Sequence, residues 1–245
     1  MEQSAADFHC EAADFTKEKN VIVPFALGAG ARKYYKEPII CNLVSYGNNI
    51  VASVTDAVRE IVETYIGKFA FYHCFETPNM HWLNERLAEQ GGKVCFMAEY
   101  YLPDVTKLRA LTCGYELRLL EQSDFAGLYL PQWGNALCED RKELDVLGVG
   151  AYEHGKLVGL AGCSADCGTM WQIGVDVLPA YRRQGIATAL TSRLAVEILK
   201  REKVPFYCSA WSNIRSMRNA VKSGFLPAWV EMTAKPADVV DKMNA

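Results

Sequence analysis

The segment Val177-Leu-Pro-Ala-Tyr-Arg-Arg-Gln-Gly-Ile-Ala-Thr188 decides how the second half of this chain folds. The apolar residues that precede it are typical of a strand, and those after Gly185 have the spacing of a long helix. The first turn of a helix leaves about four backbone N–H groups without intrahelical partners and carries the positive end of the helix dipole. The segment therefore predicts a strand-to-helix turn that suits a pyrophosphate.

Three properties of this turn favour an anion. Gly185 allows the backbone to approach a ligand closely, and the small Ala187 leaves the approach open. Arg182 and Arg183 add positive charge, or one of them is simply a solvated surface residue.

The residues around this turn predict a sheet with helices on it. Periodicity and turn residues indicate strands at 115–120, 146–153, 156–163, 170–178, 205–211 and 228–234. Helices are expected after Ser123, from about Gly185 to Glu202, and from the cap residue Ser212 or Asn213 to Ser223.

The order of elements changes near Cys113, which predicts two lobes, residues 1–112 and 113–245. In the first lobe the pattern indicates a hairpin within 39–54, a helix that Gly67 ends, a strand at 69–75, a helix at 77–90 and a strand at 93–101. Leu27–Lys33 contains two glycines but lacks the rest of a phosphate-binding loop, so a turn is the favoured interpretation.

The composition excludes several classes of protein. Twenty-six basic and 29 acidic residues give a net charge of -3, which speaks against a nucleic-acid partner. No signal peptide and no apolar stretch of membrane-spanning length is present, so we expect no membrane partner and a cytoplasmic location. Nine cysteines, an odd number, indicate reduced thiols, and Cys163-x-x-x-Cys167 lacks the second ligand pair that a metal site needs.

A family resemblance rests on two motifs in the second half. Arg182-x-x-Gly185-x-Ala187 resembles the acetyl-CoA signature R/Q-x-x-G-x-G/A of the GNAT superfamily of N-acetyltransferases. Asn213-Ile-Arg-Ser216, followed by Gly224-Phe225, resembles the later helix of that superfamily. The resemblance covers residues 115–234 and implies a mixed, mostly antiparallel, splayed sheet flanked by helices, preceded here by a smaller α/β lobe.

The resemblance also implies a cosubstrate, acetyl-CoA, and the residues that bind it. The pyrophosphate would lie on the backbone amides of residues 183–188, and the pantetheine arm would pair with the strand edge at 175–177. Asn213 and Ser216 would face the thiol end, although Asn213 could equally be a plain helix cap. The residues assigned to the cosubstrate are Val175, Val177, Arg182, Arg183, Gly185, Ile186, Ala187, Thr188, Asn213 and Ser216.

The reaction needs a base for the acceptor amine and an acid for the CoA sulfur. Asp176 and Glu231 are the candidate bases for the acceptor amine, since each lies on a strand that would border the site. Many GNAT members carry a tyrosine, as the acid toward the CoA sulfur, at the position that Ala220 occupies here. Tyr207, Ser209 or Ser216 would then replace it, the thiolate would leave unprotonated, or activity would be reduced.

We expect an enzyme that acetylates a primary amine of a small molecule by direct attack in a ternary complex, without a metal. The alternatives are a non-catalytic acyl-CoA sensor and an acetyltransferase for protein or peptide amines. The first lobe would cover the acceptor side or form a homodimer contact. The two-lobe layout, with Trp133 and Tyr181, also resembles the zwittermicin A resistance acetyltransferases, more weakly.

Overall fold

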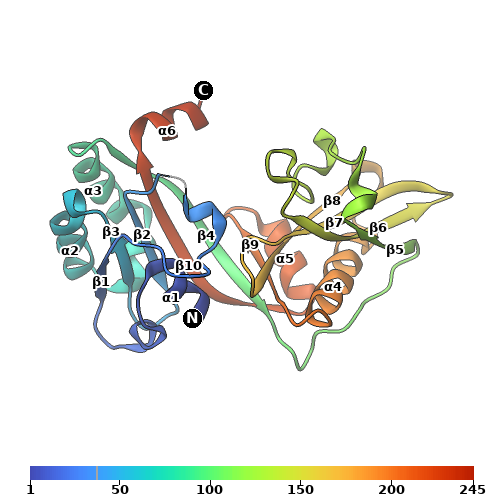
Figure 1. Cartoon of the computed structure of the whole chain (residues 1–245), viewed down its shortest axis with the longest axis horizontal. Helices are drawn as coiled ribbons and strands as arrows, with labels where there is room; N and C mark the ends of the chain where they lie inside the picture. Colours follow the sequence, from blue (N-terminus) through green and yellow to red (C-terminus); the bar gives the residue numbers. More distant parts are fainter. Residues whose placement is uncertain (37) are drawn as a thin grey trace. The chain divides into compact units, whose positions relative to one another are not determined.

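The computed structural model describes residues 1–36 and 38–245. It divides into two compact units, the first made of residues 1–99 and 228–245 and the second of residues 100–227 (Figure 1). This differs from the division at 112/113 expected above, because the last strand and helix belong with the first unit. That strand pairs with a strand of the N-terminal region, and the order of elements along the sequence does not reveal this pairing.

The first unit is a sheet with helices packed on it. Its neighbouring strands are, in order, β1 (Val21–Pro24), β3 (Val51–Val54), β2 (Cys41–Ser45), β10 (Phe225–Pro236) and β4 (Gly92–Pro103). β1 runs parallel to β3, whereas β2 runs antiparallel to both β3 and β10. The helices are α1 (Glu2–Phe8), η1 (Ala12–Thr16), η2 (Lys33–Lys36), η3 (Asp56–Val58), α2 (Arg59–Lys68), η4 (Phe71–Phe75), α3 (Thr77–Ala88) and α6 (Ala237–Met243).

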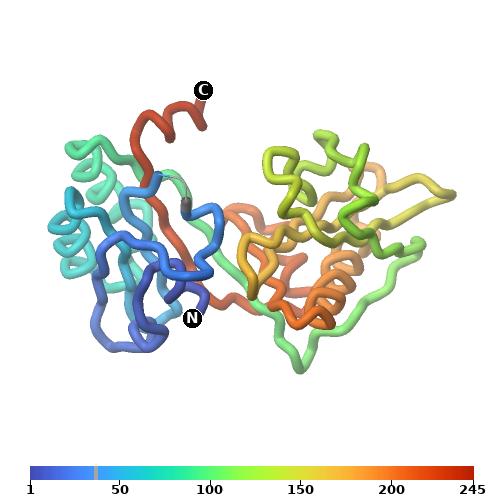
Figure 2. Tube along the Cα trace, viewed as in Figure 1, coloured from blue at the N-terminus to red at the C-terminus, as the bar shows by residue number. Residues whose placement is uncertain are grey.

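The core of the first unit lies between this sheet and the helices α2 and α3. Val62 and Leu83 from the helices pack with Leu43 and Met232 from the strands. The tube in Figure 2 shows the red C-terminal strand beside the blue N-terminal strands, as the β10–β2 pairing requires.

Two expectations for this unit were wrong. Residues Phe71–Phe75 form the 3-10 helix η4 and not a strand, because they fold back against α2, where the Tyr65 hydroxyl donates to the Cys74 carbonyl at 2.7 Å. Gly67 lies inside α2, which continues to Lys68.

The second unit contains a five-stranded, mostly antiparallel run. Its strands are, in order, β9 (Val204–Ser209), β8 (Met170–Val177), β7 (Lys156–Ser164), β6 (Asp145–Glu153) and β5 (Glu116–Glu121). Only the β8–β9 pair within this run is parallel. The helices are η5 (Gln122–Phe125), η6 (Pro131–Trp133), η7 (Glu139–Arg141), η8 (Pro179–Tyr181), α4 (Ile186–Leu199) and α5 (Ile214–Lys222).

Helix α4 covers one face of this run of strands, where Leu190, Leu194 and Ile198 pack with Val149 and Ala161. The expected α/β class, a mostly antiparallel sheet flanked by helices, is confirmed. The helix expected after Ser123 is only the 3-10 turn η5, which begins with a capping box between Glu121 and Asp124. None of the helices in the described residues has the length and apolarity of a membrane crossing.

Candidate functional site

The N-terminus of α4 has the geometry of an open anion site. Gly185 is its N-cap residue at φ 81°, in the left-handed region that favours glycine, and no side chain caps the helix. No acidic residue occupies the first turn. The amides of this turn, which a side-chain cap would normally satisfy, are therefore available to an external anion, and the helix dipole favours negative charge there.

The residues before Gly185 bring positive charge to this helix end. Arg182 and Arg183 are exposed, and Arg183 also adopts a positive φ of 65°. The Arg182 Nε donates to the Val177 carbonyl at 3.0 Å, which connects the turn to the end of β8. Ile186 is 1% exposed and packs in the core, so a ligand could meet only its backbone.

The strands beside this turn separate. β8 pairs with β9 from Met170↔Val204 to Ile173↔Tyr207, and beyond that point β8 continues in partnership with β7 as far as Val177↔Gly159. The recorded β9 pairing thus stops four residues before β8 ends. The β9-facing edge of residues 174–177, which includes Val175 and Val177, is where an extended ligand could add hydrogen bonds.

A chain of neutral polar side chains joins α4 to α5 and β9. The Thr188 hydroxyl donates to the Asn219 Oδ1 at 3.1 Å, and the Asn219 Nδ2 donates to the Thr191 hydroxyl at 3.0 Å. The hydroxyls of Tyr207 and Ser216 lie 2.7 Å apart. Two of the predicted residues, Thr188 and Ser216, are thereby found in one polar neighbourhood.

Asn213 has the capping role that was one of its two expected roles. Its Oδ1 accepts the backbone N–H of Ser216 at 3.1 Å, which orients the first turn of α5. Ala220 follows Ser216 by one helical turn and is fully buried, so this face of α5 offers a hydroxyl only at Ser216.

Asp176, predicted as a base, anchors a loop. Its carboxylate accepts from the Asn135 backbone N–H at 2.8 Å, the Asn135 Nδ2 at 2.6 Å and the Ala136 backbone N–H at 3.0 Å. The loop approaches the sheet so closely that a Cβ on Gly174 would lie 1.8 Å from the Asn135 carbonyl oxygen. This geometry argues against Asp176 as the base, because its oxygens are committed to the loop.

Glu231, the other predicted base, is enclosed in the first unit. Its Oε1 accepts from the Arg32 Nη2 and the Trp229 Nε1, both at 2.8 Å, and its Oε2 accepts from the Tyr35 hydroxyl at 2.8 Å. The side chain of Glu231 is 2% exposed. The structure therefore places Glu231 in an enclosed and fully paired position, and its expected catalytic role stays a prediction.

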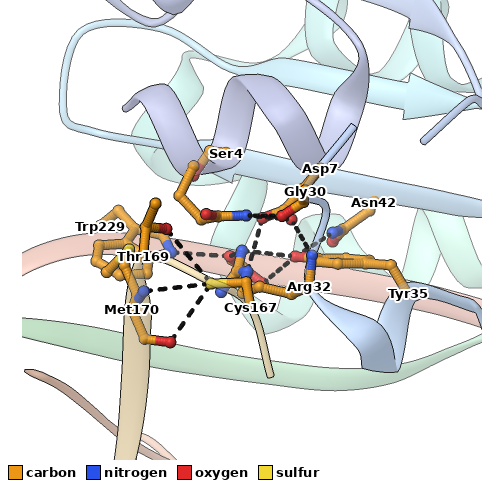
Figure 3. A network of polar contacts seen from close by, with 12 residues as sticks. Ser4, Asp7, Gly30, Arg32, Tyr35, Asn42, Cys167, Thr169, Met170 and Trp229 are labelled. Atoms are coloured by element: carbon orange, nitrogen blue, oxygen red, sulfur yellow. Dashed lines mark hydrogen bonds and ion pairs between the residues drawn. The ribbon is translucent and has the colours of Figure 1, made fainter. Parts of the chain in front are cut away.

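Arg32 is the centre of this enclosed cluster (Figure 3). Its Nε donates to the Asp7 carboxylate at 2.6 Å, and its guanidinium stacks on the Tyr34 and Tyr35 rings. Burial raises the pKa of Asp7, although Arg32 opposes this shift. The segment that was considered as a phosphate loop therefore ends in a buried ion pair, and the Gly28 N–H donates to the Ala6 carbonyl at 2.7 Å.

Two contributors to the site were missed from the sequence. Asn219 could have been found, because it follows Ser216 by three residues and so lies on the same face of α5. Asn135 could not, because it lies 41 positions from Asp176, in a loop without a periodic pattern. In the described residues no group of three or more His, Cys, Asp or Glu side chains is placed to hold a metal ion, and all nine cysteines are free.

Comparison with known families identifies the second unit. The model of the Acetyltransferase (GNAT) family matches residues 114–225, so this part of the chain is similar to a GNAT acetyltransferase domain. The family implies acyl transfer from acetyl-CoA. The resemblance stated from the two motifs is thereby confirmed for this segment. No curated protein matches the chain.

Several solved structures are similar to the chain at low identity. A GCN5-related N-acetyltransferase from Kribbella flavida is 14% identical, with 81% of this chain and 87% of that chain covered and a TM-score of 0.49. A GCN5-related N-acetyltransferase-like protein from Streptococcus suis is 20% identical, with 64% and 68% covered and a TM-score of 0.47.

A putative acetyltransferase from Salmonella typhimurium, solved with its cofactor acetyl-CoA, is 18% identical, with 51% of this chain and 95% of that chain covered and a TM-score of 0.39. Such values are too low to carry a substrate or a mechanism from these proteins to this chain. The second resemblance, to the zwittermicin A resistance acetyltransferases, stays a prediction.

Proposed function

We propose that the second unit is an N-acetyltransferase that moves the acetyl group of acetyl-CoA to a primary amine of a small molecule by direct attack in a ternary complex. One observation carries this proposal: the uncapped N-terminus of α4, preceded by Arg182 and Arg183, lies directly after the strand whose pairing with β9 stops short. A phosphate-bearing ligand with an extended arm suits this combination.

The proposed binding mode uses mostly backbone. The amides of residues 183–188 hold the pyrophosphate, and the edge of residues 175–177 pairs with the pantetheine arm. A backbone N–H near Val177 then polarises the thioester carbonyl and stabilises the oxyanion that forms on attack.

The acceptor amine enters in its neutral form. Because Asp176 and Glu231 are both committed to other partners, neither is proposed as its base. The amine attacks the carbonyl carbon, and the proton that the new C–N bond displaces passes to solvent.

Two alternatives remain testable. The buried alanine at position 220 suits an acyl-CoA sensor that has lost its chemistry. A protein or peptide amine would replace the small molecule if the acceptor face is an extended groove. A homodimer and a cytoplasmic location are parts of the same proposal.

The experiment is a thermal-shift assay with acetyl-CoA, CoA and unrelated nucleotides, followed by thiol release against small amines and peptides. We expect stabilisation by the two CoA compounds alone and thiol release that depends on a small amine. Stabilisation without release would favour the sensor, release only with peptides would favour the second alternative, and no stabilisation would overturn the cosubstrate assignment.

A further inference from the structure

The hydroxyls of Tyr207 and Ser216 form the end of a hydrogen-bonded chain that begins at α4. Tyr207 is 4% exposed and its hydroxyl lies 2.7 Å from that of Ser216, while hydrogen bonding from the Asn219 side chain lowers the pKa of the phenol against the larger rise that burial causes. Ser216 lies in the first turn of α5 and is only half-buried. The polar chain therefore runs from a half-buried amide through a buried phenol to a half-buried hydroxyl that a ligand can reach.

The partners of Asn219 fix the direction of this chain. Its Oδ1 accepts from the Thr188 hydroxyl, so its Nδ2 is the donating end. One of the two Nδ2 N–H groups donates to the Thr191 hydroxyl. The second N–H is available to the phenol oxygen of Tyr207. A phenol oxygen that accepts from Asn219 directs its own O–H to the Ser216 Oγ, which leaves the Ser216 O–H to donate outward.

The position of the chain in the fold connects it to the cosubstrate site. Tyr207 is the last residue of β9 that pairs with β8, so it stands where the two strands separate. Thr188 lies in the first turn of α4, the turn proposed to hold the pyrophosphate. The point where the strands separate and the turn proposed to hold the pyrophosphate thus border the same series of polar side chains.

Resting on the proposed function, we propose that Ser216 donates the proton to the CoA sulfur as the thiol leaves, and that Tyr207, oriented by Asn219, supplies Ser216 with that proton. Ser216 is the catalytic residue of this pair, because it touches the sulfur. Tyr207 and Asn219 are positioning residues that act through Ser216.

The step is balanced as follows. The amine nitrogen forms a bond to the acyl carbon, and collapse of the tetrahedral intermediate breaks the C–S bond, with the electron pair leaving on sulfur. Sulfur takes the proton of the Ser216 Oγ while that oxygen takes the proton of Tyr207, and Asn219 stabilises the phenolate by its N–H. The phenolate regains a proton from solvent, which has received the one that the amine lost. Burial raises the pKa of Tyr207, so the phenol begins each turnover protonated.

Variants of Ser216 and Tyr207 test whether the two residues contribute to kcat. Ser216→Ala should lower kcat by about 100-fold and Tyr207→Phe by about 10-fold, because general acids contribute roughly 100- to 10,000-fold and solvent can partly replace one. The KM for acetyl-CoA should change little. Ser216→Thr, which keeps a hydroxyl, should restore most of kcat. Ser212→Ala and Tyr152→Phe are matched controls, because neither residue belongs to this series of hydrogen-bonded side chains, and both variants should leave kcat unchanged.

The binding of CoA tests the contact between Ser216 and the CoA sulfur without turnover. An alkyl thiol ionises near pH 8.5, so a donor at the sulfur should make the protein bind CoA more tightly relative to desulfo-CoA as the pH rises from 7 to 10. Calorimetry should show this increase for the wild type and a flat ratio for Ser216→Ala.

Unchanged kcat in Ser216→Ala, or the same pH-dependent binding ratio in that variant and the wild type, would overturn the relay. A wild type that binds CoA compounds but releases no thiol with any amine would instead overturn the proposed function. In that case the binding ratio alone decides whether Ser216 contacts the sulfur.

Discussion

The two units each contain a polar network, and the two networks differ in charge and in access. In the first unit, Arg32 is held between the carboxylates of Asp7 and Glu231, and all three side chains are at most 2% exposed. In the second unit the members are hydroxyls and an amide, and the network ends on the half-buried Ser216 beside an uncapped helix N-terminus. In this protein the charged network is therefore the sealed one, whereas the neutral network is the one that a ligand can reach.

Arg32→Met should produce the largest effect on stability, because it leaves Asp7 and Glu231 buried without their counter-charge. Loss of one partner from a buried ion pair costs about 3–5 kcal/mol. Chemical denaturation should report this loss, whereas Arg86→Met, which breaks the exposed pair with Glu89, should cost at most about 1 kcal/mol. Similar losses in the two variants would contradict the contrast drawn between a sealed and a solvated ion pair.

Gly185→Asp should weaken CoA binding by about 100-fold, because the new carboxylate would cap the α4 amides and repel the pyrophosphate. Gly185→Asn is the matched control, since asparagine has the same shape, tolerates a positive φ and lacks the charge. Calorimetric titration of both variants with CoA measures the difference. Wild-type affinity for CoA in Gly185→Asp would show that the anion binds elsewhere.

The second unit also contains a buried carboxylate, Asp145, which is 2% exposed. Its Oδ2 accepts the Cys138 N–H at 2.9 Å. Burial raises its pKa to about 6. An acid whose pKa is higher in the folded state binds its proton more tightly there, so its contribution to stability is greatest at low pH and is lost as the pH rises through about 6.

Asp145→Asn should remove this slope and gain up to about 2 kcal/mol relative to the wild type between pH 4 and pH 7. Denaturation curves at several pH values measure the gain. A difference between the two proteins that stays constant with pH would show that Asp145 titrates normally in the folded state.

Asp176→Asn should have the smallest effect, a stability loss of about 1 kcal/mol, because the amide keeps an acceptor for the loop but loses the charge-assisted bonds. Thiol release at saturating amine should stay within a few-fold of the wild type. A drop in kcat of about 100-fold, with the fold retained, would return Asp176 to the role of general base.

Much of the second unit could be predicted because its signals are local. The turn at residues 177–188, the cap at Asn213 and the strand periodicities each depend on neighbours within a few positions. The strand expected at 69–75 failed for a different reason, since its apolar residues meet α2 instead of another strand. Apolar content shows that a segment is buried but not what covers it.

The sequence by itself determined the similarity to GNAT acetyltransferases, the glycine turn before α4 and the order of strands and helices in residues 114–225, since helix caps and glycine turns follow from local backbone geometry. The tertiary structure decided which carboxylates are enclosed, which unit receives the last strand, and which hydroxyl ends the polar chain. Those facts depend on pairs such as Arg32 with Glu231 or Asn135 with Asp176, which lie 199 and 41 positions apart. Only the packed chain brings such residues within hydrogen-bonding distance.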